Sequence, residues 1–259
     1  MPHPRLTIGV LTLNEEQRLP ACLRSAAFAD ELIVVDSGST DRTLEIARSF
    51  GAAVHVHADW QGFAAQRNRL LRHATGDYVF FVDADEQVSP ELRAEVEAVV
   101  RSDAPGVWTV RWRVVAFGRE LRHFGGQAAI RRLFRRDQLV EFTGIVHEHA
   151  ELRDPRLPER HLRGPLLHHS RETVHASLRK LTQYAMLGAA KRLAAGKRGG
   201  VLRGGASGAA IFFRLYLMRR AFLDGGPGFL FCFFIALECF FRYAALAYDR
   251  DQLAADVRR

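Results

Sequence analysis

Cysteine is scarce in this chain, and its three residues, Cys22, Cys232 and Cys239, have no Cys-x-x-Cys spacing. An odd number of scattered cysteines indicates neither a disulfide framework nor a zinc site, so we expect reduced thiols. Strand-like sequence begins at Arg5, and no secretory signal peptide is therefore expected. The usual nucleic-acid motifs are missing as well, so nucleic acid is not expected as a partner.

Long apolar runs are also missing. The uninterrupted run at 228–237 is about half as long as the ~20 residues that a membrane-spanning helix requires. Charge is uneven, since residues 1–159 carry a net charge of −3 and residues 160–259 carry +11. A basic C-terminal part rich in Phe and Leu, with arginines mixed among the aromatics of 211–223, favours helices lying on an anionic membrane surface. The alternative is that these helices pack on each other or on a second copy of the chain.

The first hundred residues contain a regular alternation of strand and helix patterns. Strands are predicted at 6–11, 31–36, 53–57 and 77–82, and helices at 16–27, 40–50, 63–74 and from Pro90. Asn14, Ser39 and Ser89 are predicted to cap three of the helices. Such alternation indicates right-handed βαβ units and a parallel sheet, hence an α/β fold. Strand-like segments at 107–115, 131–136, 145–152 and 165–169 predict a mixed continuation of the sheet, and the sequence from Glu172 onward predicts helices.

Two carboxylates follow the strongest strand signal in the chain. The apolar run 78–82 ends at Asp83-Ala84-Asp85, and side chains two apart on an extended segment point to one side. Ligands of parallel sheets bind at the carboxyl ends of strands. Two carboxylates held close together repel unless a cation lies between them, and oxygen ligands suit Mg²⁺ or Mn²⁺ with phosphates completing the shell. The alternative is a solvated turn.

Four features in order resemble the nucleotide-binding half of the family 2 glycosyltransferases, which share the GT-A fold. They are Thr12–Glu15 after the first strand, Val34–Asp41 after the second, Gln66–Asn68 on the third helix and Asp83–Asp85. Segments 132–135, 144–148 and 167–170 are similar to bacterial transferases that decorate the inner core of lipopolysaccharide. The expected parts are a nucleotide-sugar-binding half (1–104), an acceptor-binding half (105–170) and a basic amphipathic helical extension (171–259).

The resemblance implies a UDP-sugar donor and a Mg²⁺ or Mn²⁺ ion. The loop Thr12–Glu15 would cradle the base, with Glu15 near the ribose, and Asn14 would either contact the ligand or cap a helix. Asp36 can accept a hydrogen bond from the imide N–H of uracil, and Arg67 can fork onto phosphate or lie on a solvated helix face. Asp83 would face ribose and metal, and Asp85 would bind the metal.

Family 2 enzymes invert the anomeric centre, which requires a general base on the acceptor side. Glu148 is the predicted base, and Glu86 is the second choice because it lies on the donor side. His147 and His169 compete for a third metal position, although a lone histidine is often a hydrogen-bonded structural residue. Arg132 and Arg135 could hold a phosphate of donor or acceptor, or form a basic rim.

The predicted function is therefore an inverting, metal-dependent transfer of a hexose, with glucose favoured by the resemblance. The acceptor would be a lipid-linked saccharide such as the lipopolysaccharide inner core, at the cytoplasmic face of the membrane. Alternatives are another UDP-sugar with a polyprenyl-phosphate or other envelope glycan acceptor, and an inactive membrane adaptor on the same scaffold. A nucleotidyltransferase would need a Gly-rich basic loop after the first strand, and a processive synthase a Gln-x-x-Arg-Trp motif; neither is present.

Overall fold

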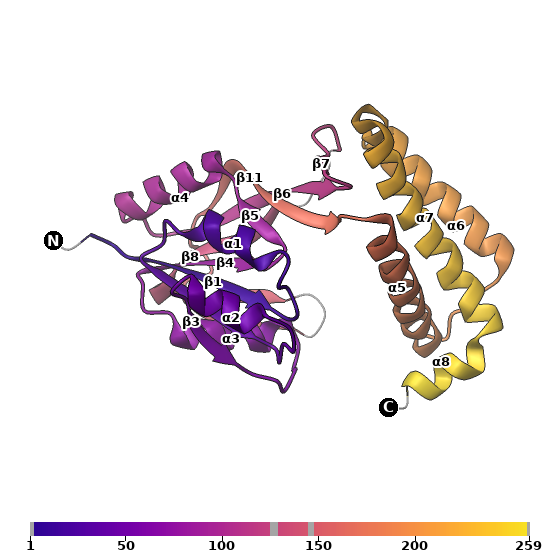
Figure 1. Cartoon of the computed structure of the whole chain (residues 1–259), viewed down its shortest axis with the longest axis horizontal. Coiled ribbons are helices and arrows are strands. Elements are labelled where there is room, and N and C mark those ends of the chain that lie inside the picture. Colours follow the sequence, from indigo (N-terminus) through magenta and orange to yellow (C-terminus); the bar gives the residue numbers. More distant parts are fainter. Residues whose placement is uncertain (1–2, 125–128, 145–147, 258–259) are drawn as a thin grey trace. The chain divides into compact units, whose positions relative to one another are not determined.

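The chain forms two compact units. The computed structural model describes residues 3–124, 129–144 and 148–257. The first unit comprises Met1–Arg113 and Gln127–His168, and the second comprises Val114–Gly126 and His169–Arg259. Helices α1 to α4 and most of the strands belong to the first unit, whereas α5 to α8, the short strand β7 and the ends of β6 and β11 belong to the second (Figure 1). The second unit thus takes in residues 114–126, a segment that the sequence assigned to the acceptor half.

The first unit is built on one mixed sheet. Its parallel part has the order β3 (Ala53–Val56), β2 (Glu31–Asp36), β1 (Leu6–Thr12), β4 (Tyr78–Asp83). The sheet continues through β8 (Ala129–Arg135), β6 (Val107–Ala116), β11 (Glu159–Arg171) and β5 (Glu86–Val88), with β7 (Arg119–Glu120) beside β6. β8 is antiparallel to both β4 and β6, and β11 is antiparallel to β5.

The sheet curls back on itself. β5 is the last strand of the sheet, four places beyond β4 in its order, yet only Ala84 and Asp85 separate the two along the chain. The order β4-β8-β6-β11-β5 must therefore bend round until β5 reaches the end of β4. Asp83-Ala84-Asp85 closes this curl, which is why the two carboxylates lie at its rim.

Helices bury both faces of the parallel strands, as the continuous apolar runs predict. On one face, Ile8 and Phe80 share a core with Leu23 of α1 (Leu19–Ala26) and with α4 (Pro90–Ser102). On the other face, Phe81 shares a core with Leu70 of α3 (Phe63–His73) and with the small sheet of β9 (Leu139–Thr143) and β10 (His149–Leu152). Helix α2 (Thr43–Ser49) completes this unit.

Gly9 of β1 lets α3 approach the sheet. A Cβ atom at this position would lie 2.2 Å from Leu70 Cδ2, well inside van der Waals contact. Because α3 also carries Arg67, its distance from the sheet decides where the guanidinium of Arg67 lies.

Two of the three predicted helix caps are wrong. Ser89 does cap α4, accepting a hydrogen bond from Leu92 N at 3.1 Å. In contrast, α1 and α2 begin several residues after Asn14 and Ser39. Asn14 has a φ of 53° and accepts from Thr40 N at 2.8 Å, while Ser39 Oγ accepts from Asn14 N at 2.8 Å. These side chains tie the loop after β1 to the loop after β2.

The second unit is helical, as predicted. It contains α5 (Val174–Ala194), α6 (Val201–Phe213), α7 (Gly225–Tyr248) and α8 (Arg250–Val257), with a π turn at Arg214–Met218 and a 3₁₀ turn at Ala221–Asp224. α6 packs closely on α7 because Gly204 and Gly208 have no side chains. Cβ atoms there would lie 2.8 Å from Phe240 O and 3.0 Å from Ala236 O. Glu238 of α7 pairs with the buried Arg171.

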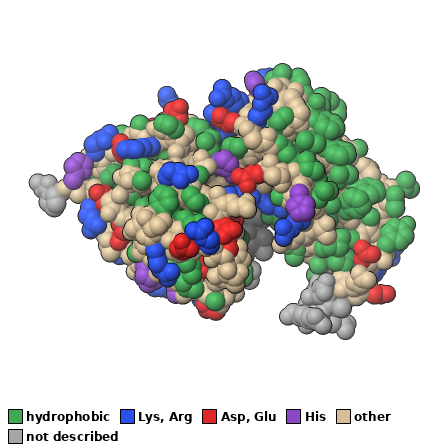
Figure 2. All heavy atoms as spheres, viewed as in Figure 1, with side chains coloured by type: hydrophobic (Ala, Val, Ile, Leu, Met, Phe, Trp, Pro, Cys, Tyr) green, Lys and Arg blue, Asp and Glu red, His purple; other side chains and the backbone are tan. Residues whose placement is uncertain are grey.

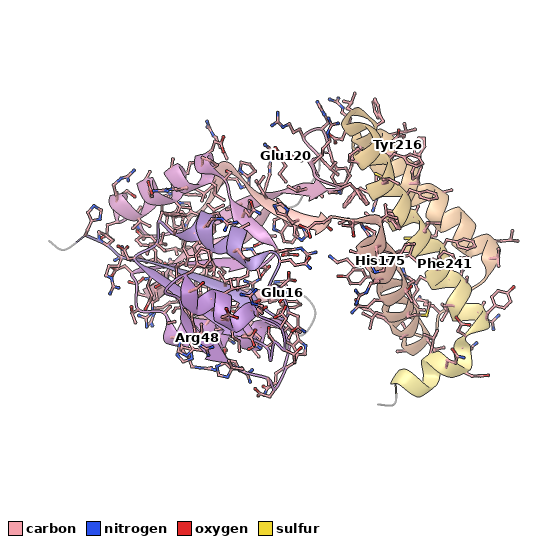
Figure 3. All side chains as sticks on the ribbon, viewed as in Figure 1. Glu16, Arg48, Glu120, His175, Tyr216 and Phe241 are labelled. Carbon is pink, nitrogen blue, oxygen red and sulfur yellow. The ribbon has the colours of Figure 1, made fainter. Side chains whose placement is uncertain are left out.

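Apolar side chains cover much of the second unit (Figure 2). Of the twenty large apolar side chains exposed among the described residues, fifteen belong to it. Phe241 of α7, labelled in Figure 3, is 42% exposed. The segment Ala221–Tyr248, which contains an 18-residue window with a mean hydropathy of 1.9, is long and apolar enough by length and composition alone to cross a membrane. α7 is longer than the uninterrupted apolar run at 228–237, because it continues through Glu238 and Arg242.

Candidate functional site

Each strand of the curl contributes a side chain to one polar cluster. These five side chains come from segments up to 85 residues apart, and they meet because the sheet closes on itself. They are Asp83 of β4, Glu86 of β5, Trp112 of β6, Arg132 of β8 and His168 of β11.

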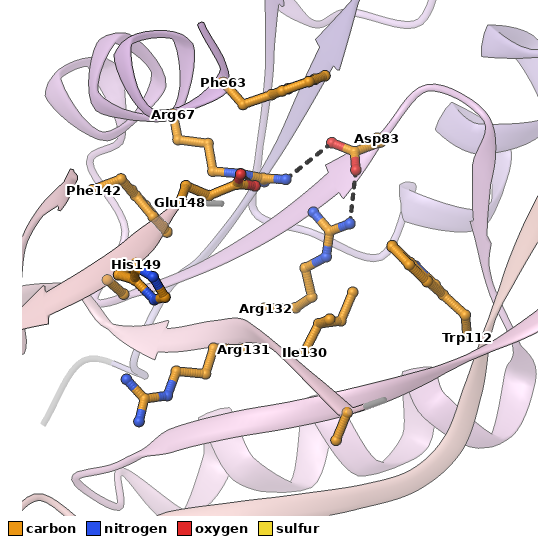
Figure 4. A pocket seen from close by; sticks show the side chains of 12 residues that line it. Phe63, Arg67, Asp83, Trp112, Ile130, Arg131, Arg132, Phe142, Glu148 and His149 are labelled. Atoms are coloured by element: carbon orange, nitrogen blue, oxygen red, sulfur yellow. Dashed lines mark hydrogen bonds and ion pairs between the residues drawn. The ribbon is translucent and has the colours of Figure 1, made fainter. Parts of the chain in front are cut away.

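Two cavities meet at this cluster. The first cavity, of about 510 Å³, includes Thr12, Glu15, Ser37, Trp60, Asp85 and His168 in its lining. The second cavity, of about 540 Å³, includes Arg67, Arg131, Arg132, Phe142, Glu148 and His149 (Figure 4). Phe63, Asp83 and Trp112 line both. The two cavities therefore adjoin within the first unit, with Asp83 common to both.

Asp83 is held between two arginines. Arg132 Nη2 donates to its Oδ2 at 2.7 Å, and Arg67 Nη2 donates to its Oδ1 at 3.3 Å (Figure 4). Burial alone would raise the pKa of Asp83, but Arg132 and Arg67 outweigh it and hold this pKa well below its usual range. Arg67 also donates Nε to Glu148 at 3.1 Å, so one guanidinium spans the two carboxylates.

Glu86 is fully buried behind Asp83. Its carboxylate accepts from Asp83 N at 2.8 Å, from Arg132 Nη2 at 2.8 Å and from Trp112 Nε1 at 2.5 Å. Burial raises the pKa of Glu86 to about 7, although Arg132 opposes the rise. Because three donors surround it inside the protein, Glu86 is poorly placed to act as the alternative base, and it braces the cluster instead.

His168, which the sequence analysis did not select, lies beside Asp85. The distance from its Nε2 to Asp85 Oδ2 is 3.3 Å, and its ring is 5.0 Å from that of Trp112. Burial lowers the pKa of His168, but the nearby Asp85 outweighs this and raises it. The inward alternation of Leu162 and Leu166 along β11 continues to residue 168, and that signal could have identified it.

Of the two predicted histidines, His169 is not among the described residues that line either cavity. His169 faces Glu172 in the second unit, with 3.7 Å between Nδ1 and Oε1. Successive side chains of a strand point to opposite faces, which separates His169 from His168. His147 lies outside the described residues. Arg135 is also remote from the site: it pairs with Asp103 and lies opposite Tyr78, at the other end of β4 from Asp83.

The donor-side loops are braced around Asp36. This carboxylate is fully buried and accepts from Gly38 N and Ser39 N, both at 2.8 Å, and from the Ser39 hydroxyl. Thr12 and Glu15 line the first cavity directly. The buried Thr12 Oγ1, and the buried Nη1 atoms of Arg67 and Arg132, have no hydrogen-bond partner among the described residues. Unsatisfied buried polar atoms beside a cavity fit a site that receives polar ligand atoms.

The cluster suits a cation that shares its ligands with a phosphate. Among the described residues, no three His, Cys, Asp or Glu side chains are arranged to hold a metal ion by themselves. Asp83 and Asp85 nevertheless both line the first cavity, and His168 lies beside Asp85. Mg²⁺ and Mn²⁺ sites commonly use one or two carboxylates and take their other ligands from substrate phosphates and water.

The sequence model described as "Glycosyl transferase family 2" matches residues 7–152, more than half of the chain. The chain belongs to family 2 of the glycosyltransferases. It is 27% identical to the "Lipopolysaccharide core biosynthesis glycosyltransferase LpsC" of Rhizobium meliloti, over 98% of this chain and 96% of that protein. It is 26% identical to the "Uncharacterized glycosyltransferase RP128" of Rickettsia prowazekii, over 93% and 86% respectively. Among solved structures, S. aureus TarS 1–349 in complex with UDP-GlcNAc is 20% identical with a TM-score of 0.47, covering 67% of this chain and 60% of that one.

Family membership confirms a glycosyltransferase with the predicted GT-A fold. The part matched by the family, residues 7–152, contains Thr12, Asp36, Arg67, Asp83, Asp85, Arg132 and Glu148. His168 lies beyond it.

Proposed function

We propose that this glycosyltransferase moves a hexose, most simply glucose, from a UDP-sugar to a lipid-linked saccharide with inversion at the anomeric carbon. The observation that carries the proposal is the pair of adjoining cavities. Carboxylates that can serve a metal ion face the first cavity, Glu148 faces the second, and Asp83 lines both. An inverting displacement needs this arrangement, because the hydroxyl must attack the anomeric carbon from the side opposite to that on which the diphosphate departs.

The donor nucleotide would occupy the first cavity. Thr12 and Glu15 are proposed to contact the nucleoside, and Arg67 the phosphates, through its unsatisfied Nη1. Asn14 and Asp36 contribute by holding the two loops together. For Asp36 to accept from uracil as well, the hydroxyl of Ser39 would have to share or release the carboxylate.

Asp85 and Asp83, with the imidazole of His168 nearby, are proposed to hold Mg²⁺ or Mn²⁺. Such an ion would supply positive charge to the departing diphosphate. The two arginines lower the pKa of Asp83 and so favour its ionised form, the form that a metal ion binds. Arg132 and Arg67 also add fixed positive charge beside the position of the leaving group.

Glu148 is proposed as the base that takes the proton from the attacking hydroxyl. Its side chain is 26% exposed, it lines the second cavity, and Arg67 Nε orients one of its oxygens. Because the same guanidinium contacts Asp83, it fixes the position of the Glu148 carboxylate with respect to the Asp83 carboxylate. This link would keep the acceptor hydroxyl and the sugar carbon in line for attack.

The proposed acceptor is a saccharide carried by a membrane lipid, such as the inner core of lipopolysaccharide. Support comes from the similarity to LpsC over nearly the whole chain and from the exposed apolar side chains and positive charge of the second unit. We propose that this unit attaches peripherally to the anionic inner face of the cytoplasmic membrane. Flotation with phosphatidylglycerol vesicles should then carry the protein upward, whereas neutral phosphatidylcholine vesicles should carry less of it.

The decisive experiment is a titration with UDP in the presence and absence of Mn²⁺ or Mg²⁺, followed by a screen for UDP release. UDP-glucose, UDP-galactose and UDP-N-acetylglucosamine are the first donors to test. The wild type should bind UDP only when a divalent ion is present. Asp85→Asn should not bind UDP more tightly when the ion is added. Failure of the wild type to bind UDP with either ion would reject the proposal.

A further inference from the structure

Two aromatic side chains and one carboxylate lie where the two cavities meet. Among the described residues, Phe63, Asp83 and Trp112 are the three whose side chains line both cavities. In Figure 4, Phe63 and Trp112 lie on either side of Asp83. Trp112 is half-buried on β6, in contrast to Trp108 of the same strand, which is 2% exposed and belongs to the core. Trp112 therefore presents ring surface to the cavities as well as to the protein.

The position of this ring relates it to the transferred sugar. If the proposed function holds, the hexose is bonded to the diphosphate in the first cavity and is attacked by a hydroxyl from the second. The hexose must then lie where the two cavities meet, against the residues common to both. A pyranose has a face of C–H groups, and burying that face on an aromatic ring is favourable.

We propose that Trp112 is the platform on which the transferred hexose stacks, and that Glu86 is a positioning residue that fixes this platform. The indole N–H of Trp112 donates to the fully buried Glu86 at 2.5 Å. The ring centroid of His168 lies 5.0 Å from that of Trp112, and Arg132 Cζ lies 5.9 Å from the Trp112 ring centroid. The ring is thus held in one orientation before any ligand arrives, which reduces the entropy lost on binding.

Comparison of UDP with a UDP-sugar separates this role from a general one. UDP fills the nucleotide part of the first cavity but carries no hexose. In Trp112→Ala the affinity for UDP, measured with the same divalent ion, should stay within about twofold of the wild type. Its affinity for the UDP-sugar that the wild type turns over fastest should fall about tenfold, which corresponds to about 1.4 kcal/mol. Trp112→Phe retains an aromatic face and should lose no more than about threefold.

Trp60 provides a matched control. It lines only the first cavity, so Trp60→Ala should weaken UDP and the UDP-sugar by the same factor. Equal losses of both ligands in Trp112→Ala, or no loss of either, would overturn the platform assignment. Such a failure of the platform assignment would leave the proposed function intact, provided that the wild type binds UDP and turns over a UDP-sugar. A wild type that does not bind UDP would reject the proposed function instead.

The role of Glu86 is tested by a double-mutant cycle. Glu86→Gln should lower the affinity for the UDP-sugar relative to UDP in the wild-type background and have no such effect when Trp112 is already alanine. Additive effects would show that Glu86 does not act through Trp112. If Trp112→Ala folds poorly, intrinsic tryptophan fluorescence provides a second test. In the wild type the UDP-sugar should change this fluorescence more than UDP does, and the difference should vanish in Trp112→Phe. A difference that persists in Trp112→Phe would contradict the proposal.

Discussion

Replacing Arg132 with methionine should destabilise the first unit in a pH-dependent way. Arg132 is 4% exposed and donates to Asp83 at 2.7 Å and to Glu86 at 2.8 Å. Methionine fills similar space but carries no charge, so both carboxylates lose a buried cation. Removing one partner of a buried ion pair typically costs about 3–5 kcal/mol, because the remaining charge is left uncompensated. Asp83 keeps Arg67 as a partner, which makes Glu86 the group that decides the outcome.

The sign of the pH effect follows from Glu86. Burial raises the pKa of Glu86 to about 7 in the folded protein, above its ordinary value of 4.5. A carboxyl whose pKa is raised by folding stabilises the protein fully at pH values below its pKa in the unfolded chain. That stabilisation is lost as the pH rises through its pKa in the folded protein. Without Arg132 the folded pKa rises further, so Glu86 stays protonated over a pH range in which the unfolded chain is ionised. The loss in Arg132→Met should be about 2 kcal/mol greater at pH 8.5 than at pH 6, since each such pH unit costs about 1.4 kcal/mol.

Urea denaturation followed by tryptophan fluorescence measures this loss. Trp60, Trp108 and Trp112 all belong to the first unit, so the signal reports that unit. Arg131→Met is the matched control, because Arg131 is on the same strand but pairs with Glu159 at the surface, and its loss should cost about 1 kcal/mol or less. An equal loss in Arg132→Met at the two pH values would refute the argument from Glu86, and a loss no larger than that of the control would refute the buried pair.

Three further outcomes are expected. Glu148→Gln should leave the affinity for UDP near the wild-type value and lower the rate of sugar transfer by about 10²–10⁴-fold, measured as turnover at saturating donor; normal turnover would remove Glu148 as the base. His168→Ala should weaken Mn²⁺ binding by the UDP-saturated protein by about 10–100-fold, whereas His169→Ala should not, and an equal response of the two variants would contradict the position of His168 beside Asp85. Gly204→Ala should lower the midpoint of thermal unfolding of the helices, followed by circular dichroism, because its Cβ would lie 2.8 Å from Phe240 O. Gly205→Ala meets nothing within 4 Å and should be neutral or stabilising, by up to about 1 kcal/mol.

The sequence predicted those parts of the site that depend on local pattern. The apolar run before Asp83, and the position of Arg67 on a helix preceding that strand, are visible in single segments. The contacts of Glu86 with Arg132 and Trp112 are not, because they depend on the order of antiparallel strands far apart in the chain. The sequence named His169 as a possible metal ligand, whereas the structure places its neighbour His168 beside Asp85, and one residue along a strand means the opposite face.

The capping predictions failed for a different reason. Asn and Ser side chains bond equally well to the first turn of a helix and to a neighbouring loop, so their identity does not decide between the two. At Ser89 the following proline favours the helix, and the prediction is confirmed. At Asn14 and Ser39 the two loops lie side by side at adjacent strand ends, and tertiary contact determines the bonds.

The absence of a side chain at position 9 lets a helix lie close to the sheet, and we expect this spacing to matter for sugar transfer. A methyl group there would overlap the buried side chain of Leu70, and we expect the overlap to be relieved partly by a shift of the helix that also carries residue 67. Random mutagenesis scored by transfer activity should therefore recover inactive clones at this buried glycine that remain folded. Such clones would be misread as stability defects unless the spacing between helix and strand were considered.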